Sequence, residues 1–186
     1  MSQKVSTVIV LIIWAFLKCN AQVADKAEDI SPLLIGEKIP DGILTDNMGG
    51  KHETGTIFNK KPTVLVIFRG GWCPYCSRQL SGLVDIEEQI INMGYQIVAV
   101  SPDNYQNLVS LEEKIEARYE IYSDENGELI KKIGIAFNSG GKRGILPVPT
   151  VMVLNQEGII LFEYINPNYR VRITPELLIA VLETVI

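Results

Sequence analysis

The sequence holds few of the residues that bind metals or act as bases near neutral pH. It has one histidine, His52, and three cysteines among 186 residues. A structural zinc site takes four ligands, and one close cysteine pair with His52 does not reach that number. We expect His52 on a surface hairpin, so no Cys–His couple is available to activate a protease-like nucleophile. We therefore expect neither a bound metal nor a cofactor.

Positive charge is also scarce. The 17 lysines and arginines are outnumbered by 22 acidic residues, which gives a net charge of −5. No basic patch, and no interleaving of basic with aromatic residues, marks a nucleic-acid surface. An acidic balance of this kind bears on solubility and little else. Nucleic acid is therefore excluded from the expected partners.

One unbroken apolar run, from Val8 to Leu17, stands near the N-terminus. It is shorter than the roughly 20 residues that a membrane-spanning helix needs. With Lys4 before it and small residues up to Ala21 after it, the run is typical of a secretory signal peptide. Lipid attachment at Cys19 is less favoured, because Lys18 stands where such a signal has a small residue.

This pattern divides the chain into three parts. We expect a signal peptide over 1–21 with cleavage after Ala21, a mobile charged leader over 22–34, and one domain over 35–186. The mature protein is then periplasmic or secreted, with no membrane span left after signal removal.

The rest of the chain alternates short apolar strands with segments of helical periodicity. Apolar and β-branched runs bounded by turn residues predict strands, and apolar residues three or four apart predict helices. The predicted strands are 43–45, 53–57, 63–68, 96–101, 120–122, 150–154 and 159–165, and the predicted helices are 73–92, 108–115, 128–133 and the segment after Thr174. This order predicts an α/β sandwich with a mixed central sheet.

Cys73 and Cys76 stand where the buried strand 63–68 passes into the next helix. Unpaired backbone N–H groups and the helix dipole lower a cysteine's pKa at such a position. A disulfide between cysteines only three positions apart closes a very short loop. Such a loop would stabilise the folded chain little, so a structural role is disfavoured. The pattern therefore favours reversible thiol–disulfide exchange over a structural disulfide or half of a metal site.

The motif and its setting resemble a known family. The order of strand, C-x-x-C and helix, with a late X-Pro before a β-hairpin, resembles the thioredoxin fold. The longer signature from Phe68 to Cys76, F-R-G-G-W-C-P-Y-C, resembles the AhpC/TSA (redoxin) family in its peroxiredoxin-like branch, which carries R-G-x-W-C-P-x-C. The similarity runs from about Ile35 to the C-terminus. It implies a three-layer α/β/α sandwich with an N-terminal β-hairpin extension.

The resemblance implies catalytic roles for both cysteines and leaves their order open. In thioredoxin-like sites the first cysteine, here Cys73, attacks, and the second, Cys76, resolves the mixed disulfide. Peroxiredoxins carry P-x-x-x-T-x-x-C, which laid on Cys76 places Cys73 at the threonine and Arg69 at the proline. Laid on Cys73, the same pattern places Val66 at the proline and Gly70 at the threonine, so it matches at neither position.

Further site residues follow from the resemblance. Thioredoxin-like proteins hold a cis proline beside the thiol pair, and Pro149 before the strand 150–154 fits that place. The backbone of Val148 would then be free to bond an extended substrate. Arg172 resembles the arginine that peroxiredoxins bring in from a later element.

The residues next to the thiol pair complete the predicted site. Arg69 is a fixed positive charge that could stabilise a thiolate or polarise a peroxide oxygen. Trp72 is expected as a wall that packs against the site and excludes water, with Pro74 and Tyr75 as further substrate contacts. The segment 138–144 is expected as a flexible loop flanking the site.

Three functions compete. The first is a secreted thiol-based antioxidant enzyme that reduces hydroperoxides and is regenerated by an external thiol reductant, such as a thioredoxin-like protein. The second is a periplasmic thioredoxin-like reductase acting on protein disulfides. The third is a non-catalytic module with an inert disulfide, whose reduction potential would lie below about −300 mV.

Overall fold

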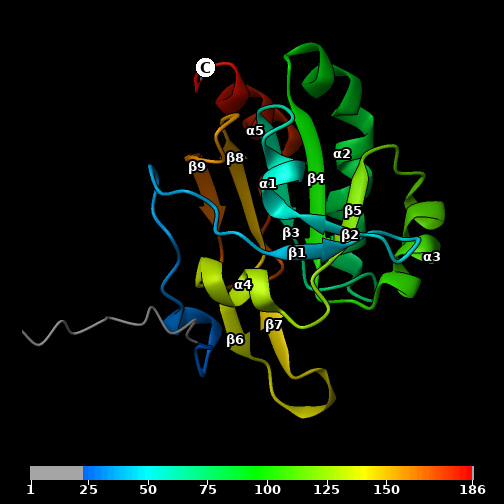
Figure 1. Cartoon of the computed structure of the whole chain (residues 1–186), viewed down its shortest axis with the longest axis vertical. Helices are drawn as coiled ribbons and strands as arrows, with labels where there is room; N and C mark the ends of the chain where they lie inside the picture. Colours follow the sequence, from blue (N-terminus) through cyan, green and yellow to red (C-terminus); the bar gives the residue numbers. More distant parts are fainter. Residues whose placement is uncertain (1–22, 186) are drawn as a thin grey trace, which may run out of the picture.

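The structure, a computed structural model, describes residues 23–185, so the predicted signal peptide and Cys19 lie outside the described residues. A seven-stranded sheet in the order β2-β1-β5-β4-β3-β8-β9 forms its centre, and β6 and β7 form a separate hairpin (Figure 1). The strands are β1 Ile43–Thr45, β2 Lys51–Glu53, β3 Thr63–Ile67, β4 Gln96–Ser101, β5 Glu120–Ser123, β6 Ala136–Asn138, β7 Ile145–Pro147, β8 Thr150–Leu154 and β9 Ile160–Ile165. The helices are α1 Thr54–Phe58, α2 Pro74–Asn92, α3 Tyr105–Ile115, α4 Glu128–Ile133 and α5 Pro175–Leu182, with short 3-10 turns at Ala27–Asp29 and Gly141–Arg143.

The middle of the sheet combines parallel and antiparallel strands. β3 pairs in parallel with β4 and β4 with β5, whereas β8 runs antiparallel to both β3 and β9. Every residue of β3 and of β8 is buried, as expected for strands covered on both faces. The mixed central sheet predicted from the sequence is confirmed.

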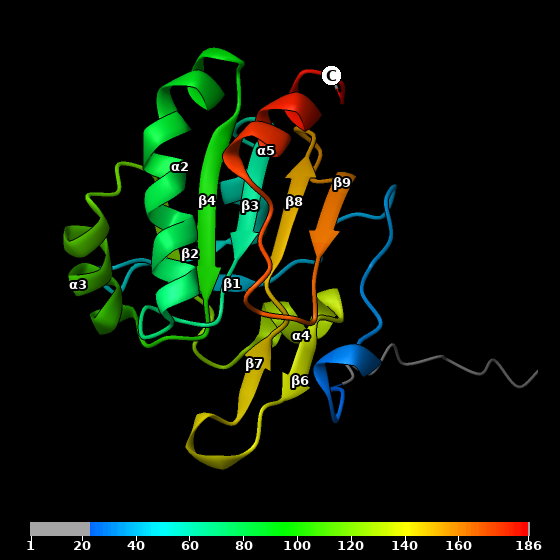
Figure 2. The ribbon, with the colours of Figure 1, turned by 180° about the vertical axis from the view of Figure 1, so that it is seen from behind.

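Helices cover both faces of this sheet. Alternate residues of β3 point to opposite faces, so Val64 and Val66 join α2, α3 and α5 in one core. Leu65 and Ile67 join α1 and α4 in the other core. Figure 2 shows α2 and α5 in front of the sheet when the molecule is seen from behind. The predicted α/β/α sandwich is confirmed, and the fold is thioredoxin-like.

Helix α2 begins at Pro74 because the residues there suit a helix N-terminus. Cys73 is the N-cap, with an extended backbone at φ −89° and ψ 114°. Pro74 takes the first helical position, where the missing N–H costs nothing. The Cys73 carbonyl accepts the N–H groups of Cys76 and Ser77, each at 3.0 Å. The strand-to-helix turn therefore places both thiols at the carboxyl end of β3.

The N-terminal hairpin differs in part from its prediction. β1 pairs antiparallel with β2 and joins the sheet through β5. The second strand is Lys51–Glu53, so the predicted strand over 53–57 is wrong. Helix α1 takes its place because it buries Ile57 and Phe58 together in the core, at 1% and 2% exposed. An alternating strand would turn these neighbours to opposite faces.

The sequence prediction missed the hairpin of β6 and β7, whose strands pair antiparallel over three residues each. Its tip is the segment 138–144, which was expected as a loop. Residues 23–34, predicted as a mobile leader, lie against this hairpin and α4. The Ala24 N–H donates to the Ala136 carbonyl and the Leu33 N–H to the Ile133 carbonyl, both at 2.9 Å. The packed part of the chain therefore starts before residue 35, and the mobility of the leader stays a prediction.

In the part of the chain that the structure describes, no helix combines the length and the apolar character needed to cross a membrane.

Candidate active site

The two described cysteines lie at the N-terminal end of α2 and are covered by other side chains. Cys73 is 1% exposed and Cys76, one helical turn further on, is 0% exposed. Both are free thiols. The loop that leads to them is fixed at its start, because the N–H of buried Phe68 donates to the Val100 carbonyl at 2.9 Å. A buried strand end and a helix start therefore hold the pair from both sides.

The pKa values of the two thiols move in opposite directions. The pKa of Cys73 is lowered to about 5, chiefly by the hydrogen bond from the Cys76 thiol. Burial opposes this change, whereas the backbone N–H groups of Cys76 and Tyr75 and the charge of Arg69 assist it. The pKa of Cys76 is raised, because its proton is held in that bond and because burial and the Cys73 charge disfavour a second thiolate. The pair therefore carries one negative charge at neutral pH, on Cys73.

Arg69 lies between two aromatic rings beside the thiols. Its guanidinium carbon is 5.1 Å from the ring centre of Trp72 and 4.3 Å from that of Tyr169. A guanidinium is attracted to a ring face at such distances. The buried Nε of Arg69 has no hydrogen-bond partner among residues 23–185. The two rings thus hold the Arg69 guanidinium near Cys73, and its Nε–H group is left without an acceptor among the described residues.

Arg172 approaches the other thiol from the segment between β9 and α5. Its Nη2 lies 3.5 Å from the Cys76 sulfur, and its charge acts against the rise in the pKa of Cys76. Its buried Nε also has no hydrogen-bond partner in the described part of the chain. The structure therefore brings together Arg69, Arg172 and both cysteines, as the sequence prediction grouped them.

The predicted substrate contacts Trp72, Pro74 and Tyr75 surround the pair. Trp72 is 38% exposed, and the Pro74 ring is also exposed at the start of α2. Tyr75 packs edge-to-face on Tyr169, with ring centres 5.7 Å apart and planes at 81°. These residues flank the two cysteines in the chain, and their contact with substrate stays a prediction.

Asp103 is a site residue that the sequence reasoning missed. It follows β4 as the thiol loop follows β3, and the carboxyl ends of parallel strands meet at one edge of the sheet. Its Oδ2 accepts the N–H of Gly71 at 2.6 Å. Gly70, at φ +142°, lies so close that an added Cβ would stand 2.7 Å from Asp103 Oδ1. Burial raises the pKa of Asp103. The available signal was an aspartate just after the second buried strand.

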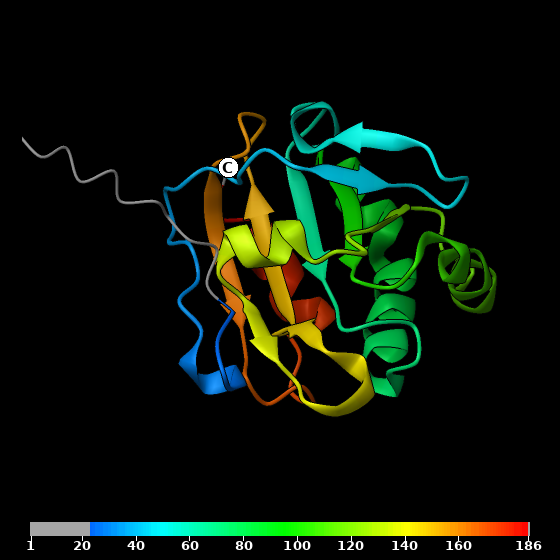
Figure 3. The same ribbon diagram turned by 60° about the horizontal axis from the view of Figure 1, so that its bottom comes forward.

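Arg143 is the second residue that was missed. It lies in the 3-10 turn at the tip of the β6–β7 hairpin, and its guanidinium carbon is 3.4 Å from the Trp72 ring centre. Figure 3 shows this hairpin projecting at the end of the molecule where β3 passes into α2. No local pattern near Arg143 signals the contact, because the contact depends on the hairpin.

The predicted cis proline is wrong. The described residues contain no cis peptide bond, so the bond before Pro149 is trans, the isomer that X-Pro bonds favour. The backbone of Val148 is also not free, as was expected. Its N–H donates to the Ile135 carbonyl at 2.9 Å, and its carbonyl accepts the Thr150 hydroxyl at 2.9 Å. The chain leading into β6 therefore binds the N–H, and a side chain of β8 binds the carbonyl, that an extended substrate was expected to bind.

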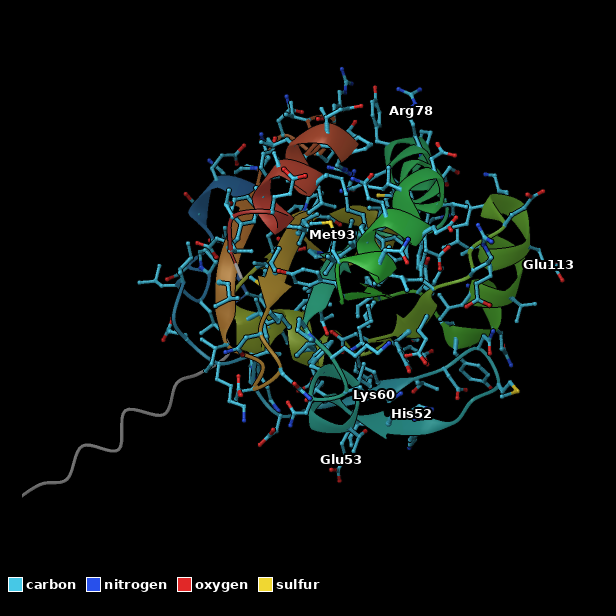
Figure 4. The ribbon with its side chains drawn as sticks, turned by 90° about the horizontal axis from the view of Figure 1, so that it is seen from above. His52, Glu53, Lys60, Arg78, Met93 and Glu113 are labelled. Carbon is cyan, nitrogen blue, oxygen red and sulfur yellow. The ribbon has the colours of Figure 1, made fainter. Side chains whose placement is uncertain are left out.

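His52 lies on the β1–β2 hairpin, as predicted, with Nε2 2.7 Å from Asp46 Oδ2. Figure 4 shows His52 and Lys60 at one side of the molecule and Arg78, two residues after Cys76, at the other. Within residues 23–185, therefore, no histidine can act as a base for the thiols.

Besides a cavity of about 480 Å³ along Trp72, two more border the site. One of about 680 Å³ is polar and lies beside Arg69, Trp72 and Arg143. The other, of about 390 Å³, lies between α2 and the segment leading into α5, with Tyr75 and Arg172 in its lining. Small molecules can therefore approach the site from more than one direction.

Two adjacent thiols, one of them ionised at neutral pH, are chemically suited to thiol–disulfide exchange. The fold and this pair together define a thioredoxin-like domain with a thiol-based site. Comparison with protein families gives its particular place: residues 35–162 match the AhpC/TSA family, and the chain belongs to it.

The individual relatives include both peroxiredoxins and thiol:disulfide interchange proteins. Peroxiredoxin bcp1 of Schizosaccharomyces pombe is 30% identical over 112 residues, which cover 60% of this chain and 57% of that protein. The chain therefore matches just over half the length of this curated relative. DsbE-2 of Pasteurella multocida, named as a probable thiol:disulfide interchange protein, is 23% identical over 172 residues, covering 91% of this chain and 79% of that one.

Solved structures show the same fold. Reduced Prx3 of Vibrio vulnificus in complex with hydrogen peroxide superposes with a TM-score of 0.76 at 19% identity, over 81% of this chain and 99% of that chain. At this identity the likeness describes the fold alone.

Proposed function

We propose that this protein is a secreted thiol peroxidase, which reduces hydroperoxides through Cys73 and Cys76 and is regenerated by an external thiol reductant. One observation carries the proposal: the structure holds Cys73 as a thiolate, with a pKa of about 5, directly beside a protonated partner thiol. A thiolate is the form that attacks a peroxide, and a neighbouring thiol is what closes the cycle.

The reaction has three steps. The Cys73 thiolate attacks the outer oxygen of ROOH, the O–O bond breaks, and the leaving RO⁻ takes a proton to give ROH. Cys73 becomes a sulfenic acid, and Cys76 then attacks its sulfur, forming the disulfide and releasing water. An external dithiol finally exchanges with this disulfide, is itself oxidised, and returns both thiols.

Each residue near the pair has a role in this scheme. Arg69 favours the Cys73 thiolate and holds a free donor that could bind a peroxide oxygen. Arg172, 3.5 Å from the Cys76 sulfur, favours its ionisation once Cys73 has lost its charge to oxygen. Trp72 and Tyr75 exclude water from the reacting sulfurs. We also propose that Pro74 keeps the helix start rigid.

Protein disulfides are the alternative substrate, and the likeness to DsbE-2 favours it. Two features of the site count against it. The backbone groups of Val148 are bonded within the chain, and both sulfurs are covered, at 1% and 0% exposed. A hydroperoxide group reaches a covered sulfur more easily than a disulfide within a peptide chain does.

Peroxide consumption by the reduced protein tests the proposal. With dithiothreitol or thioredoxin as donor, we expect hydrogen peroxide or an alkyl hydroperoxide to disappear far faster than with donor alone. Insulin reduction under the same conditions should be slow. A peroxide rate no faster than that of free thiol, with rapid insulin reduction, would replace this proposal by the disulfide reductase. Failure of both reactions, with a potential below about −300 mV, would leave an inert disulfide.

Secretion is part of the proposal and rests on the N-terminal sequence pattern of 1–21. Expression of the full chain in a bacterial host tests it. We expect the mature N-terminus at Gln22 in a periplasmic or extracellular fraction, and an uncleaved cytoplasmic product would contradict it. Mass spectrometry of the mature protein would also detect a lipid on Cys19.

A further inference from the structure

The β6–β7 hairpin reaches the active site from outside the main sheet. Its two strands pair with each other outside the main sheet, β6 also bridges to Ala24, and its tip, at Gly141–Arg143, is a short 3-10 turn. Figure 3 shows the hairpin at the end of the molecule where β3 passes into α2. Nothing in the reaction proposed above uses this hairpin, so its contact with the thiol loop calls for another role.

The contact is a stack of Arg143 on Trp72. At 3.4 Å, the distance from its guanidinium carbon to the ring centre is shorter than any other arginine–aromatic distance in residues 23–185. Arg69 approaches the same indole at 5.1 Å. Trp72 is thus the ring that contacts both Arg143 of the hairpin tip and Arg69 of the thiol loop.

Asp103 adds an electrostatic link to the same contact. Its carboxylate holds the Gly71 N–H, and the charge of Arg143 acts on it. Both side chains line the polar cavity beside Trp72. The hairpin tip is therefore attracted both to the indole ring and to the carboxylate that fixes the thiol loop.

This arrangement affects small and large reactants differently. Cys73 is 1% exposed although it stands at the very start of α2. Attack on a disulfide needs three sulfurs nearly in line, so a protein partner has to bring its own chain up to Cys73. A hydroperoxide or dithiothreitol needs space only for a few atoms.

We propose that Arg143 is a specificity-determining residue, which holds the β6–β7 hairpin on Trp72 and so limits the reaction of the thiol pair with protein partners while small reagents react freely. Protein disulfides and protein reductants then react only when the stack opens. The inference rests on the proposed function for its biological meaning, since it favours small oxidants over protein disulfides.

Alkylation of Cys73 in the reduced Cys76→Ser protein tests this directly. The rate with iodoacetamide, a small reagent, is compared with the rate for a maleimide carried on a long polyethylene glycol chain. Arg143→Ala removes the stack, and Lys142→Ala is the matched control, because Lys142 is an exposed cation in the same turn. An exposed cation–π contact corresponds to roughly a two- to five-fold change in the open population.

We expect Arg143→Ala to raise the large-reagent rate about two- to five-fold and to leave the iodoacetamide rate unchanged. Lys142→Ala should change neither rate, and Arg143→Lys, which keeps the charge and loses the planar group, should lie between. Equal changes for both reagents, or no change in the large-reagent rate, would overturn the inference. Circular dichroism of each variant verifies that the fold is kept.

The same variants separate this inference from the proposed function. Reduction of the oxidised Cys73–Cys76 disulfide by thioredoxin should accelerate in Arg143→Ala, whereas reduction by dithiothreitol should not. Neither this measurement nor alkylation needs peroxide turnover. If the wild-type chain consumes no peroxide but these ratios shift, the peroxidase proposal fails and the role of Arg143 stands.

Discussion

The surroundings of Cys73 and of Cys76 differ sharply, although the two thiols are one helical turn apart. Cys73 is the N-cap, outside the helix, and its sulfur receives hydrogen bonds from the Cys76 thiol and from backbone N–H groups. Cys76 lies inside the first turn, where its sulfur receives one backbone N–H, from Arg69, and a contact from Arg172. Position relative to the helix start, rather than residue type, decides which sulfur is ionised.

The packing around the two thiols differs as well. On the Cys73 side, Gly70 is wedged between Trp72 and Asp103 with no space for a methyl group. On the Cys76 side, the same helix leaves room: at Gly82 an added Cβ would be 3.8 Å from Pro175, an ordinary contact. A methyl group therefore has no space at Gly70 and has space at Gly82.

The largest expected effect comes from exchanging each sulfur for oxygen. Cys73→Ser should reduce peroxide turnover to the level of donor alone. Cys76→Ser should react once and stop, because the sulfenic acid on Cys73 has no thiol to condense with. Dimedone labelling followed by mass spectrometry detects that sulfenic acid. If Cys73→Ser instead forms a stable sulfenic acid on Cys76, the order of attack is reversed.

The pH dependence of Cys73 is the next effect. Its pKa falls from an ordinary 9.0 to about 5 in the folded protein, so the alkylation rate of reduced Cys73 should reach half its maximum near pH 5. A group whose pKa is lower in the folded state than in the unfolded state stabilises the fold fully at a pH above its unfolded-state pKa. This stabilisation is lost as the pH falls through its folded-state pKa. Reduced wild type should therefore gain stability over Cys73→Ser as the pH rises from 5 to 9.

Urea unfolding of both proteins at several pH values measures this difference. The raised pKa of Cys76 acts in the opposite sense only above pH 9, where its unfolded-state thiol ionises. A stability difference between the two proteins that does not change with pH would show that Cys73 is not ionised selectively in the fold.

Glycine substitutions compare the packing on the two sides. Gly70→Ala places a methyl group against Trp72 and Asp103 at φ +142°, which should destabilise the protein by about 2–4 kcal/mol through strain and overpacking. Gly82→Ala, within α2 and in ordinary contact, should be neutral or stabilising by up to about 1 kcal/mol. Urea unfolding of the reduced proteins gives both values. Equal losses in the two variants would contradict the difference in packing.

The smallest effects come from the two arginines. Arg69→Ala should raise the pKa of Cys73 by about one unit or less, because the charge of Arg69 is the weakest of the causes that lower it. Arg172→Ala should leave that pKa unchanged and slow only the condensation with Cys76. Thiolate absorbance against pH measures the first, and stopped-flow disulfide formation the second. An equal effect of both variants on the Cys73 pKa would show that the arginines do not act on separate thiols.

Much of the fold could be predicted because its main elements are long and locally regular. The strands 96–101 and 150–154 and the helix 128–133 agree with the structure residue for residue. Each has a buried strand pattern or a helical period of its own. By contrast, β6 and β7 have three residues each and form through pairing with each other and with Ala24, and α1 forms because the core buries Ile57 with Phe58.

The site divides in the same way. Cys73, Cys76 and Arg69 could be found because they stand together in one motif, and Arg172 through a family resemblance. Arg143 could not, since it reaches Trp72 from a distant hairpin, and Asp103 was missed although it stands just after the second buried strand. The backbone of Val148 was expected to be free because a cis proline was expected at Pro149.

The sequence by itself determined an α/β sandwich with a mixed sheet and the thiol pair at the strand–helix turn, because hydrophobic periodicity and the C-x-x-C motif are local. The thioredoxin-like fold was implied by a family resemblance. Only the tertiary structure decided which thiol is ionised, which loops hold it and what covers it. Those properties depend on hydrogen bonds, charges and ring contacts over a few ångströms, between residues far apart in the chain. For Cys73 and Cys76, chemistry comes from the motif and the division of roles comes from the fold.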